Sequence, residues 1–363
     1  MSGSAGGGQS SRHPDKFLRF KIMKRVLIVI LIASAFAVLS SSCSNSAKTS
    51  SDAIPVILDT DMGNDVDDAL ALAMLNRYSD EGRIKMLGVM INKNDTASAE
   101  CVDIINTYYG YGDTPIGVAE KPVDSSADGV NINDMNFVTA VSKMDFPRTV
   151  KDYSSLPSAV QLYRRLLASQ EDNSVKIISV GFSTNLAALL DSQADDISPL
   201  TGRELLEKKV KEVCVMAGNF RGEGNDWFSE YNVQRDIPSA RKFFAECPAP
   251  MSISPFELGI ELTYPGASIE KNLGYEGKNP VAEAYKAYLP MPYDRPIWDL
   301  TAVLYAVEGE EYFTKSVPGK AEIDENGLAR FTQDSSGKHV LLSVPETSKS
   351  ALVDRCRELC EAR

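Results

Sequence analysis

The sequence is poor in the side chains from which zinc and iron–sulfur sites are built. Its 363 residues include only two histidines, His13 and His339, and its six cysteines form no C-x-x-C pair. Zinc sites in proteins combine cysteine and histidine at short, characteristic spacings. We therefore expect neither a zinc site nor an iron–sulfur cluster in this protein.

An excess of positive charge is also missing. The chain has 38 lysines and arginines against 50 aspartates and glutamates, which gives a net charge of −12. A surface that binds nucleic acid needs a basic excess to neutralise the phosphates. Nucleic acid is therefore excluded as the expected partner, whereas small neutral substrates and hard cations stay compatible with the charge.

A hydrophobic run long enough to span a membrane comfortably is not found either. The apolar stretch Val26–Leu39 is shorter than the roughly 20 residues of a membrane-spanning helix. It follows Lys24-Arg25 and precedes three serines and Cys43, an arrangement typical of a secretory signal peptide. The cysteine after small residues resembles a bacterial lipoprotein signal, although Leu39 stands four positions before it instead of three.

This resemblance implies that Cys43 is lipidated and becomes the first residue of the mature chain. We expect an exported protein that a lipid anchors to a bacterial membrane, on the periplasmic side or at the cell surface. An uncleaved anchor, or ordinary secretion with an unmodified Cys43, remains the alternative. Residues 1–22 are interpreted as a leader of doubtful origin, residues 23–42 as the signal peptide and residues 43–53 as a polar tether.

Residues 54–363 are predicted to form one domain, because no repeat or clear linker interrupts them. Short apolar runs alternate with amphipathic segments, a pattern typical of an α/β fold with an open, mostly parallel sheet and helices on both faces. The predicted strands are Ile54–Leu58, Lys85–Ile91, Val175–Val180 and Glu212–Met216, and the predicted helices are Ala69–Tyr78 and Ala97–Tyr109. We expect long loops at 120–155 and 264–296, and a β-hairpin within Lys315–Val344.

The strongest local feature is a run of aspartates directly after the first predicted strand. The segment Asp59–Asp68 reads D-T-D-M-G-N-D-V-D-D, with five aspartates in ten residues. Carboxylates packed at the carboxyl end of a strand repel one another unless a cation offsets their charge. Helix capping would account for one or two of them. The cluster therefore predicts a Ca²⁺ or Mg²⁺ site made of oxygen ligands.

Two other aspartate motifs fit this segment poorly. An EF-hand loop that began at Asp59 would need glycine at position 64 and glutamate at position 70, where the chain has Asn64 and Leu70. A phosphatase of the haloacid dehalogenase type begins with a strand and D-x-D, but it requires threonine or valine where Gly63 stands. That phosphoester hydrolase is kept as the alternative enzyme.

The run I-L-D-T-D-M-G-N-D-V-D-D-A-L-A resembles the N-terminal signature of the inosine–uridine preferring nucleoside hydrolase family, whose usual form is D-T-D-P-G-x-D-D-A. Further segments agree in the order that the family has. They are Val180–Leu186 (V-G-F-S-T-N-L), Val215–Gly218 (V-M-A-G), Gly224-Asn225, Ser229–Asn232 (S-E-Y-N) and Ile297–Asp299 (I-W-D). The similarity extends from about residue 54 to beyond residue 305.

The resemblance implies a calcium-dependent enzyme that hydrolyses the N-glycosidic bond of ribonucleosides to ribose and free base. Carried over position by position, the calcium ligands are Asp61, Asp68, the main-chain carbonyl of Thr184, and Asp299. Such a set leaves room on the ion for a water and two ribose hydroxyls. Asp61, beside that water, is implied to be the general base.

The same resemblance implies a sugar pocket and a base pocket. The residues implied to bind the sugar are Asp67, Asn94, Asn225, Glu230 and Asn232. Asn92 fits the position of Asn94 nearly as well.

Many members of the family have a leaving-group histidine just before the late aspartate, where this chain has Trp298. An indole in this place resembles the purine-preferring branch, in which it stacks on the base. The alternative is a tryptophan that packs in the core. Trp227 is a second candidate for stacking on the base.

The first motif also departs from the family form. Five residues, Met62 to Val66, separate Asp61 from the final pair of aspartates, where the common form has three. Asp65 is therefore a rival to Asp68 as a metal ligand. Besides the phosphoester hydrolase, a non-catalytic lipoprotein that binds nucleosides remains an alternative, and association of the chain into a homo-oligomer is left open.

Overall fold

The computed structural model describes residues 53–93, 96–121, 123, 137–222, 224, 226–274 and 278–361. All of these belong to one compact unit that runs from Ser50 to Arg363. The predictions for Cys43, Asn94 and Asn225, and for the leader, signal peptide and most of the tether, lie outside the described residues. Within the described ranges, no helix is both long and apolar enough to cross a membrane.

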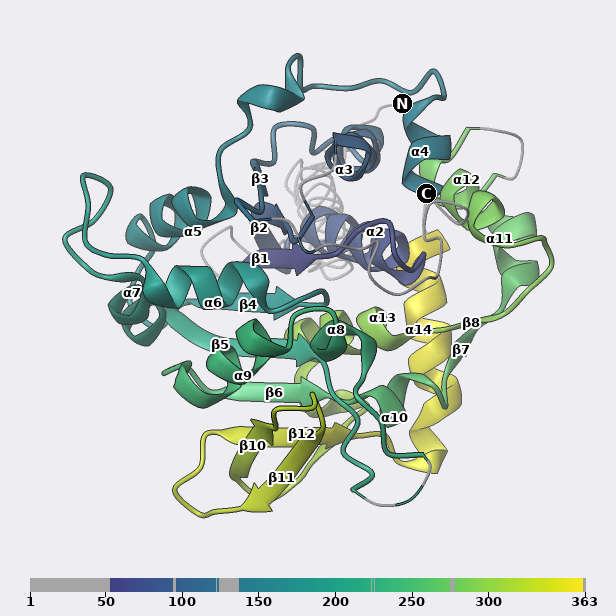
Figure 1. The fold of residues 1–363 in the computed structure, drawn as a ribbon. Helices are drawn as coiled ribbons and strands as arrows, with labels where there is room; N and C mark the ends of the chain where they lie inside the picture. Colours follow the sequence, from purple (N-terminus) through teal and green to yellow (C-terminus); the bar gives the residue numbers. More distant parts are fainter. Residues whose placement is uncertain are drawn as a thin grey trace, which may run out of the picture. The chain divides into compact units, whose positions relative to one another are not determined.

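A ten-stranded sheet forms the centre of the unit (Figure 1). Its order is β11-β10-β12-β6-β5-β4-β1-β2-β3, and β9 pairs with β12 off this path. Neighbours from β12 through to β3 run parallel, which confirms the predicted mostly parallel sheet. The parallel strands are β1 (Ile54–Thr60), β2 (Ile84–Ile91), β3 (Ile116–Val118), β4 (Val175–Ser179), β5 (Val210–Met216), β6 (Met251–Ser254) and β12 (His339–Ser343).

Helices pack on both faces of the sheet, also as predicted. One face carries α2 (Asp67–Asp80), α3 (Thr96–Tyr108), α4 (Phe137–Ser142), α11 (Gly266–Asn272), α12 (Pro280–Tyr288), α13 (Trp298–Glu308) and α14 (Lys349–Glu361). The other face carries α5 (Ala159–Ala168), α6 (Thr184–Asp191), α7 (Gly202–Lys209) and α9 (Ile237–Glu246). Two short helices, α8 (Tyr231–Gln234) and α10 (Phe256–Gly259), follow β5 and β6 respectively.

The strands supply both hydrophobic cores because successive side chains point to opposite faces. On β1, Val56 and Leu58 join the core under α2 and α13, whereas Ile57 joins the core under α5 and α6. Both cores are buried, so the strand is apolar at consecutive positions instead of alternating with polar residues. This burial on two sides explains why the apolar runs in the sequence predicted the strands.

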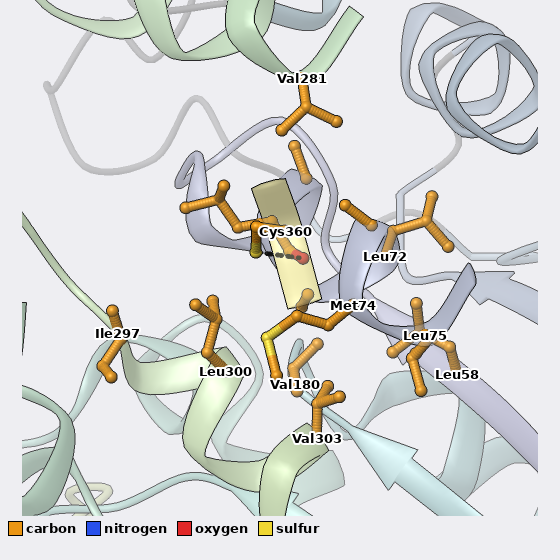
Figure 2. Packing of buried hydrophobic residues seen from close by; sticks show 14 of the residues in the cluster. Leu58, Leu72, Met74, Leu75, Val180, Val281, Ile297, Leu300, Val303 and Cys360 are labelled. Atoms are coloured by element: carbon orange, nitrogen blue, oxygen red, sulfur yellow. Dashed lines mark hydrogen bonds between the residues drawn. The ribbon is translucent and has the colours of Figure 1, made fainter. Parts of the chain in front are cut away.

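The core between α2, α13 and α14 ties the start of the domain to its end. Figure 2 shows Met74 of α2 in one cluster with Leu300 and Val303 of α13 and with Cys360 of α14. The Sγ atom of Cys360 lies 3.6 Å from the carbonyl oxygen of Leu70. The packing fixes the first turns of α2 and α13 relative to each other, and both first turns carry aspartates.

The C-terminal part extends the sheet with antiparallel strands. β10 (Gly319–Ile323) pairs with β11 (Ala329–Gln333), and Gly327 in the connecting turn has a φ of +78°, which favours glycine. This hairpin confirms the prediction for Lys315–Val344. The short β9 (Thr314–Lys315) pairs antiparallel with β12.

The prediction of a long loop at 264–296 was wrong, because this segment contains α11, α12 and the strand β8 (Arg295–Pro296). β8 pairs with β7 (Thr263–Tyr264). Asn279 caps α12 by accepting hydrogen bonds from the backbone N–H groups of Val281 and Ala282. Pro280 suits the first turn, where its missing N–H costs no hydrogen bond. The prolines and polar residues that were interpreted as loop signals in fact begin helices. In the described part of 120–155, α4 and a short 3-10 helix, Tyr153–Ser155, interrupt the predicted loop.

Candidate active site

A pocket of about 330 Å³ lies where β1, β4 and β5 end and where α2, α8 and α13 begin. β1 has β2 on one side and β4 on the other, so the direction in which the chain adds strands reverses there. Ligands of open α/β sheets bind at such a point, beyond the carboxyl ends of the strands. The volume is in the range of small-molecule sites. The pocket is lined by Asp61, Asn64, Asp65, Asp67, Asp68, Val180, Met216, Phe228, Glu230, Tyr231, Asn232, Phe256, Tyr288, Arg295, Trp298 and Asp299.

Four of the lining aspartates are almost completely removed from solvent. Asp61, Asp67, Asp68 and Asp299 expose between 1% and 5% of their surface. Burial raises the pKa of Asp61 to about 6, and it raises the pKa values of the other three well above the usual range. For Asp68 and Asp299 the nearby aspartates raise the pKa further. The pocket therefore concentrates negative charge in a place where water cannot offset it.

Hydrogen bonds satisfy this cluster only in part. The Thr60 hydroxyl donates to Oδ1 of Asp68, and Asn64 donates to Oδ2 of Asp61. The Oδ2 atom of Asp68 is buried and accepts no hydrogen bond from the described residues. A buried carboxylate oxygen without a donor is costly. An unpartnered oxygen amid like charges is the environment that a hard cation would stabilise.

The donor chemistry fits calcium, although the side chains are not gathered around a single point. Within the described ranges, no group of three or more histidine, cysteine, aspartate or glutamate side chains stands in an arrangement that could hold a metal ion as it is. The available ligands are nevertheless all oxygen, which suits Ca²⁺ or Mg²⁺.

Asp65 and Asp68, the two rivals within the first motif, have different environments. Asp65 is half-buried and pairs with Arg295, whose Nε lies 2.8 Å from Oδ1 of Asp65 and whose Nη2 donates to Oδ2. Asp68 has no such cationic partner among the described residues. The charge of Asp65 is therefore already offset by a guanidinium, whereas that of Asp68 is not.

Glu230 and Asn232 lie at the start of α8, where the backbone orients both side chains. Glu230 caps this helix by accepting from the backbone N–H of Asn232, and its other oxygen accepts from the backbone N–H of Gly218 at 2.9 Å. Burial raises the pKa of Glu230 to about 7. The Asn232 amide donates to the carbonyls of Val180 and Met216, so it bridges the ends of β4 and β5.

Aromatic side chains also line the pocket. Trp298 stacks on Phe256 with ring centroids 5.5 Å apart, and its indole N–H donates to the Phe256 carbonyl at 3.0 Å. Phe228, Tyr231 and Tyr288 line the same cavity. Trp298 is thus held by core contacts and also faces the pocket. A pocket that combines aromatic side chains with a cluster of polar groups suits a ligand with one aromatic and one hydroxyl-rich end.

Trp227, the second stacking candidate, lies elsewhere. Its indole N–H donates to the carbonyl of Ala329 in β11 at 3.2 Å, and the Arg330 guanidinium lies 4.2 Å from its ring centroid. It is not among the residues that line the pocket. These contacts fix Trp227 on the C-terminal hairpin, so it was an incorrect candidate.

The remaining predicted residues surround the pocket without lining it. Thr184 begins α6 and donates its hydroxyl to Asp236 at 2.6 Å, and the role of its carbonyl stays a prediction. Asn92 donates to Asp59, which also accepts from Tyr163 at 2.6 Å. Burial raises the pKa of Asp59 to about 7. Asn92 therefore belongs to a buried network behind β1, and the sugar-contacting role of Asn94 stays a prediction outside the described residues.

Sequence reasoning missed several residues of the wall. Arg295, Tyr288 and Phe256 come from segments without a recognisable motif. Arg295 lies three residues before Trp298 and Phe256 two residues after the end of β6, which was the one signal for them, and Tyr288 had none. Tyr231 lies inside the quoted S-E-Y-N segment but received no role. The motifs located the carboxylates and Trp298, whereas the fold supplied the other aromatic residues and Arg295.

Comparisons with known proteins show the family to which the chain belongs. A family model described as inosine-uridine preferring nucleoside hydrolase matches residues 56–356. A relative of the same description from Leishmania major is 23% identical over 285 residues, which cover 75% of this chain and 84% of the relative.

Solved structures share the fold at low sequence identity. A purine-preferring ribonucleoside hydrolase from Gardnerella vaginalis has a TM-score of 0.65 at 17% identity, over 85% of this chain and all of that chain. An inosine-uridine preferring nucleoside hydrolase from Bacillus anthracis has a TM-score of 0.63 at 16% identity with the same coverage. The type III effector protein XopQ, solved with adenosine diphosphate ribose, also has a TM-score of 0.63 at 16% identity, over 85% of this chain and 94% of that one.

Proposed function

The chain belongs to the inosine–uridine preferring nucleoside hydrolase family and is a ribonucleoside N-glycosyl hydrolase, and we propose that it works with bound Ca²⁺ and favours purine nucleosides. One observation carries the proposal. A single pocket joins a buried carboxylate cluster, with an unpartnered oxygen on Asp68, to an aromatic wall that includes Trp298. Family membership sets aside the phosphoester hydrolase and the non-catalytic binding protein.

The residues proposed to hold the ion are Asp61, Asp68, Asp299 and the carbonyl of Thr184. Asp68 is preferred to Asp65 because Asp65 already has Arg295 as its partner. When bound, Ca²⁺ supplies a fixed positive charge that orients ribose hydroxyls and lowers the pKa of the attacking water. The unpartnered Asp68 oxygen and the mutual repulsion of the aspartates support this ligand set.

Asp61 is proposed to accept the proton of the attacking water. Burial brings its pKa to about 6, which is closer to neutrality than that of an ordinary aspartate. General bases work best when their pKa lies near the working pH. Asp67, Glu230 and Asn232, with Asn94 and Asn225, are proposed to bind the ribose. Their oxygens also favour the positive charge that develops on the sugar ring as the C–N bond breaks.

The purine preference rests on the aromatic side chains that line the pocket, Trp298 above all. An indole offers more overlap to a two-ring base than to a one-ring base, and offset stacking contributes about 1 kcal/mol beyond area burial. Trp298 and Phe256 form a stacked pair and line the same pocket as the carboxylates. A purine held there would extend along this wall while its ribose reaches the carboxylates.

A nucleoside panel tests the proposal. Pure protein is incubated with inosine, guanosine, uridine and a sugar phosphate, with calcium or with chelator, and the products are identified by mass spectrometry. Free base and ribose from the purine nucleosides, lost on chelation and restored by Ca²⁺, are expected. Activity that is indifferent to chelator contradicts the calcium proposal, and faster hydrolysis of uridine than of inosine contradicts the purine preference.

We also propose that the mature protein is a lipoprotein of the bacterial envelope, with its lipid on Cys43. The basic start, the apolar run Val26–Leu39 and the small residues before Cys43 support this proposal. The polar tether of residues 43–53 would let the hydrolase domain stand away from the membrane surface. Its substrates would then be nucleosides that arrive from outside the cytoplasm.

A further inference from the structure

The pocket holds a single positively charged side chain among its described residues, that of Arg295. All other charged groups that line it are carboxylates, and Asp65 is the one that Arg295 pairs with. Arg295 lies in β8, a short strand held against β7, directly before α13. A lone guanidinium in an acidic pocket is a feature that metal binding and sugar binding do not explain.

Contacts on two sides hold this guanidinium in place. Its Nε and Nη2 atoms donate to the two oxygens of Asp65, a two-pronged pairing that fixes the plane of the group. The guanidinium carbon lies 5.1 Å from the ring centroid of Tyr288 and 5.2 Å from that of Trp298. The Nη1 atom makes no hydrogen bond to any described residue, so its two N–H groups are available to a ligand.

Several other donors of the pocket are already engaged. The Trp298 indole N–H donates to the Phe256 carbonyl. The Asn232 amide donates to the carbonyls of Val180 and Met216. No histidine lines the described pocket. Among the described residues of the pocket, Arg295 is therefore the positively charged hydrogen-bond donor beside a departing base that lies against Trp298.

We propose that Arg295, oriented by Asp65, contacts the departing base and stabilises the negative charge that develops on it. The inference rests on the proposed function, because it takes the base to lie along the Trp298 wall. As water adds to the anomeric carbon, the bond from that carbon to the base nitrogen breaks and its electron pair moves onto the base. Arg295 donates hydrogen bonds to the base nitrogens but keeps its own proton, since guanidinium stays protonated in proteins. The base then takes up a proton from solvent, and the proton of the attacking water passes to Asp61.

A substrate whose base departs without negative charge distinguishes a role of Arg295 in stabilising the leaving base from a purely structural role. In 7-methylinosine the methyl group fixes a positive charge on the purine, so the departing base is neutral. Arg295→Gln should lower kcat/KM for inosine about 10²-fold, the usual effect of removing one donor to a developing anion. On 7-methylinosine the same variant should lose at most about threefold, or gain, because the repulsion between two cations is removed.

Further variants identify how Arg295 acts. Arg295→Lys should restore part of the inosine rate, because it keeps the charge but loses the two-pronged contact with Asp65. Asp65→Asn should lower kcat on inosine more than it changes KM, since Asp65 is a positioning residue that acts through Arg295. Arg203→Gln is the matched control, because Arg203 pairs with Glu246 at an exposed site on α7 and should leave both substrates unaffected. Circular dichroism checks that each variant is folded.

Three outcomes overturn the inference. Equal losses on inosine and 7-methylinosine would show that Arg295 only supports the wall. A selective loss of inosine activity in Tyr231→Phe but not in Arg295→Gln would assign the leaving-group role to a phenol. A wild-type enzyme that hydrolyses neither substrate would overturn the proposed function itself, which is a result distinct from the first two.

Discussion

Asp67 accepts a hydrogen bond of 3.0 Å from the backbone N–H of Asp299. The two residues are 232 positions apart in the sequence, and each lies in the first turn of a helix, α2 or α13. The bond therefore joins the two helix starts that bring carboxylates into the pocket. Backbone N–H groups at the start of a helix also favour nearby negative charge. Asp67 is in this way both a pocket residue and the connection between the halves of the acidic cluster.

Calcium binding should depend on Asp68 and not on Asp65. We expect extensively desalted protein to bind one Ca²⁺ per chain, measured by isothermal titration calorimetry. Asp68→Asn should abolish tight binding because it removes the oxygen that lacks a partner. Asp65→Asn, a matched change three positions away, should retain tight calcium binding because Asp65 is paired with Arg295. The reverse result would assign the ligand role to Asp65.

Asp61→Asn should abolish turnover while the fold is kept. Loss of a general base costs about 10² to 10⁴ in rate, and weaker metal binding adds to this loss. Steady-state rates on inosine at saturating calcium measure the effect, and circular dichroism reports the fold. Asp152→Asn, at an exposed loop position, serves as the control. If Asp61→Asn turns over inosine nearly as fast as the wild type, another residue is the base.

Trp298→Ala should lower kcat/KM more for purine nucleosides than for uridine. Stacking on a two-ring base contributes about 1 kcal/mol, so the selective part of the loss should be severalfold. Trp298→Phe keeps a flat ring and should retain part of the preference. Comparison of kcat/KM for inosine, guanosine and uridine provides the measurement. An equal loss on all three, together with lower thermal stability, would make Trp298 a core residue only.

Without calcium, the protein should be more stable at pH 5 than at pH 8. Burial raises the pKa of Asp61 from 3.8 to about 6, and the pKa values of Asp59 and Glu230 to about 7. Between pH 4 and pH 7 the unfolded chain thus loses protons that the folded chain keeps, so the free energy of unfolding contributed by these groups falls as pH rises.

Thermal denaturation in chelator and in calcium at the two pH values measures this effect. Calcium should raise Tm more at pH 8 than at pH 5, because its ligands must be deprotonated to bind it. In chelator, Asp61→Asn should narrow the difference between the two pH values, since it removes one of the titrating groups. A Tm in chelator that rises from pH 5 to pH 8 would contradict the expected loss of stability with rising pH. An increase of Tm by calcium that is the same at both pH values would contradict the expected deprotonation of its ligands.

Lipidation at Cys43 predicts that the mature protein partitions into detergent when it is expressed in a bacterium with its own signal. Cys43→Ser should remain unlipidated and leave the detergent phase. Mass spectrometry of the mature N-terminus identifies the modification directly. A wild-type protein that is found free in the periplasm, with an N-terminus other than Cys43, would refute the proposal.

The acidic half of the site could be located from the sequence because its determinants are local. Apolar runs predicted β1, β4 and β5, and these strands end directly before the segments that contain Asp61, Val180 and Gly218. Carboxyl ends of parallel strands meet at one edge of a sheet, so the motifs had to converge. The hairpin turn at Gly327 was equally local, since it depends on residues a few positions apart.

The aromatic half and the pairing of charges were decided by the tertiary structure. Nothing within the first motif shows whether Asp65 or Asp68 is free of a cation, because the answer depends on Arg295, 230 residues away. Trp227 follows one family-like segment and Trp298 lies within another, yet the first packs on β11 and the second lines the pocket. The sequence by itself determined which elements form and at which edge the carboxylates gather, since neighbours along the chain fix both. Only the packing of α13 against α2 and the contact of Arg295 in β8 with Asp65 decided which partner each charge meets, because such contacts form between segments that the chain brings together only when it folds.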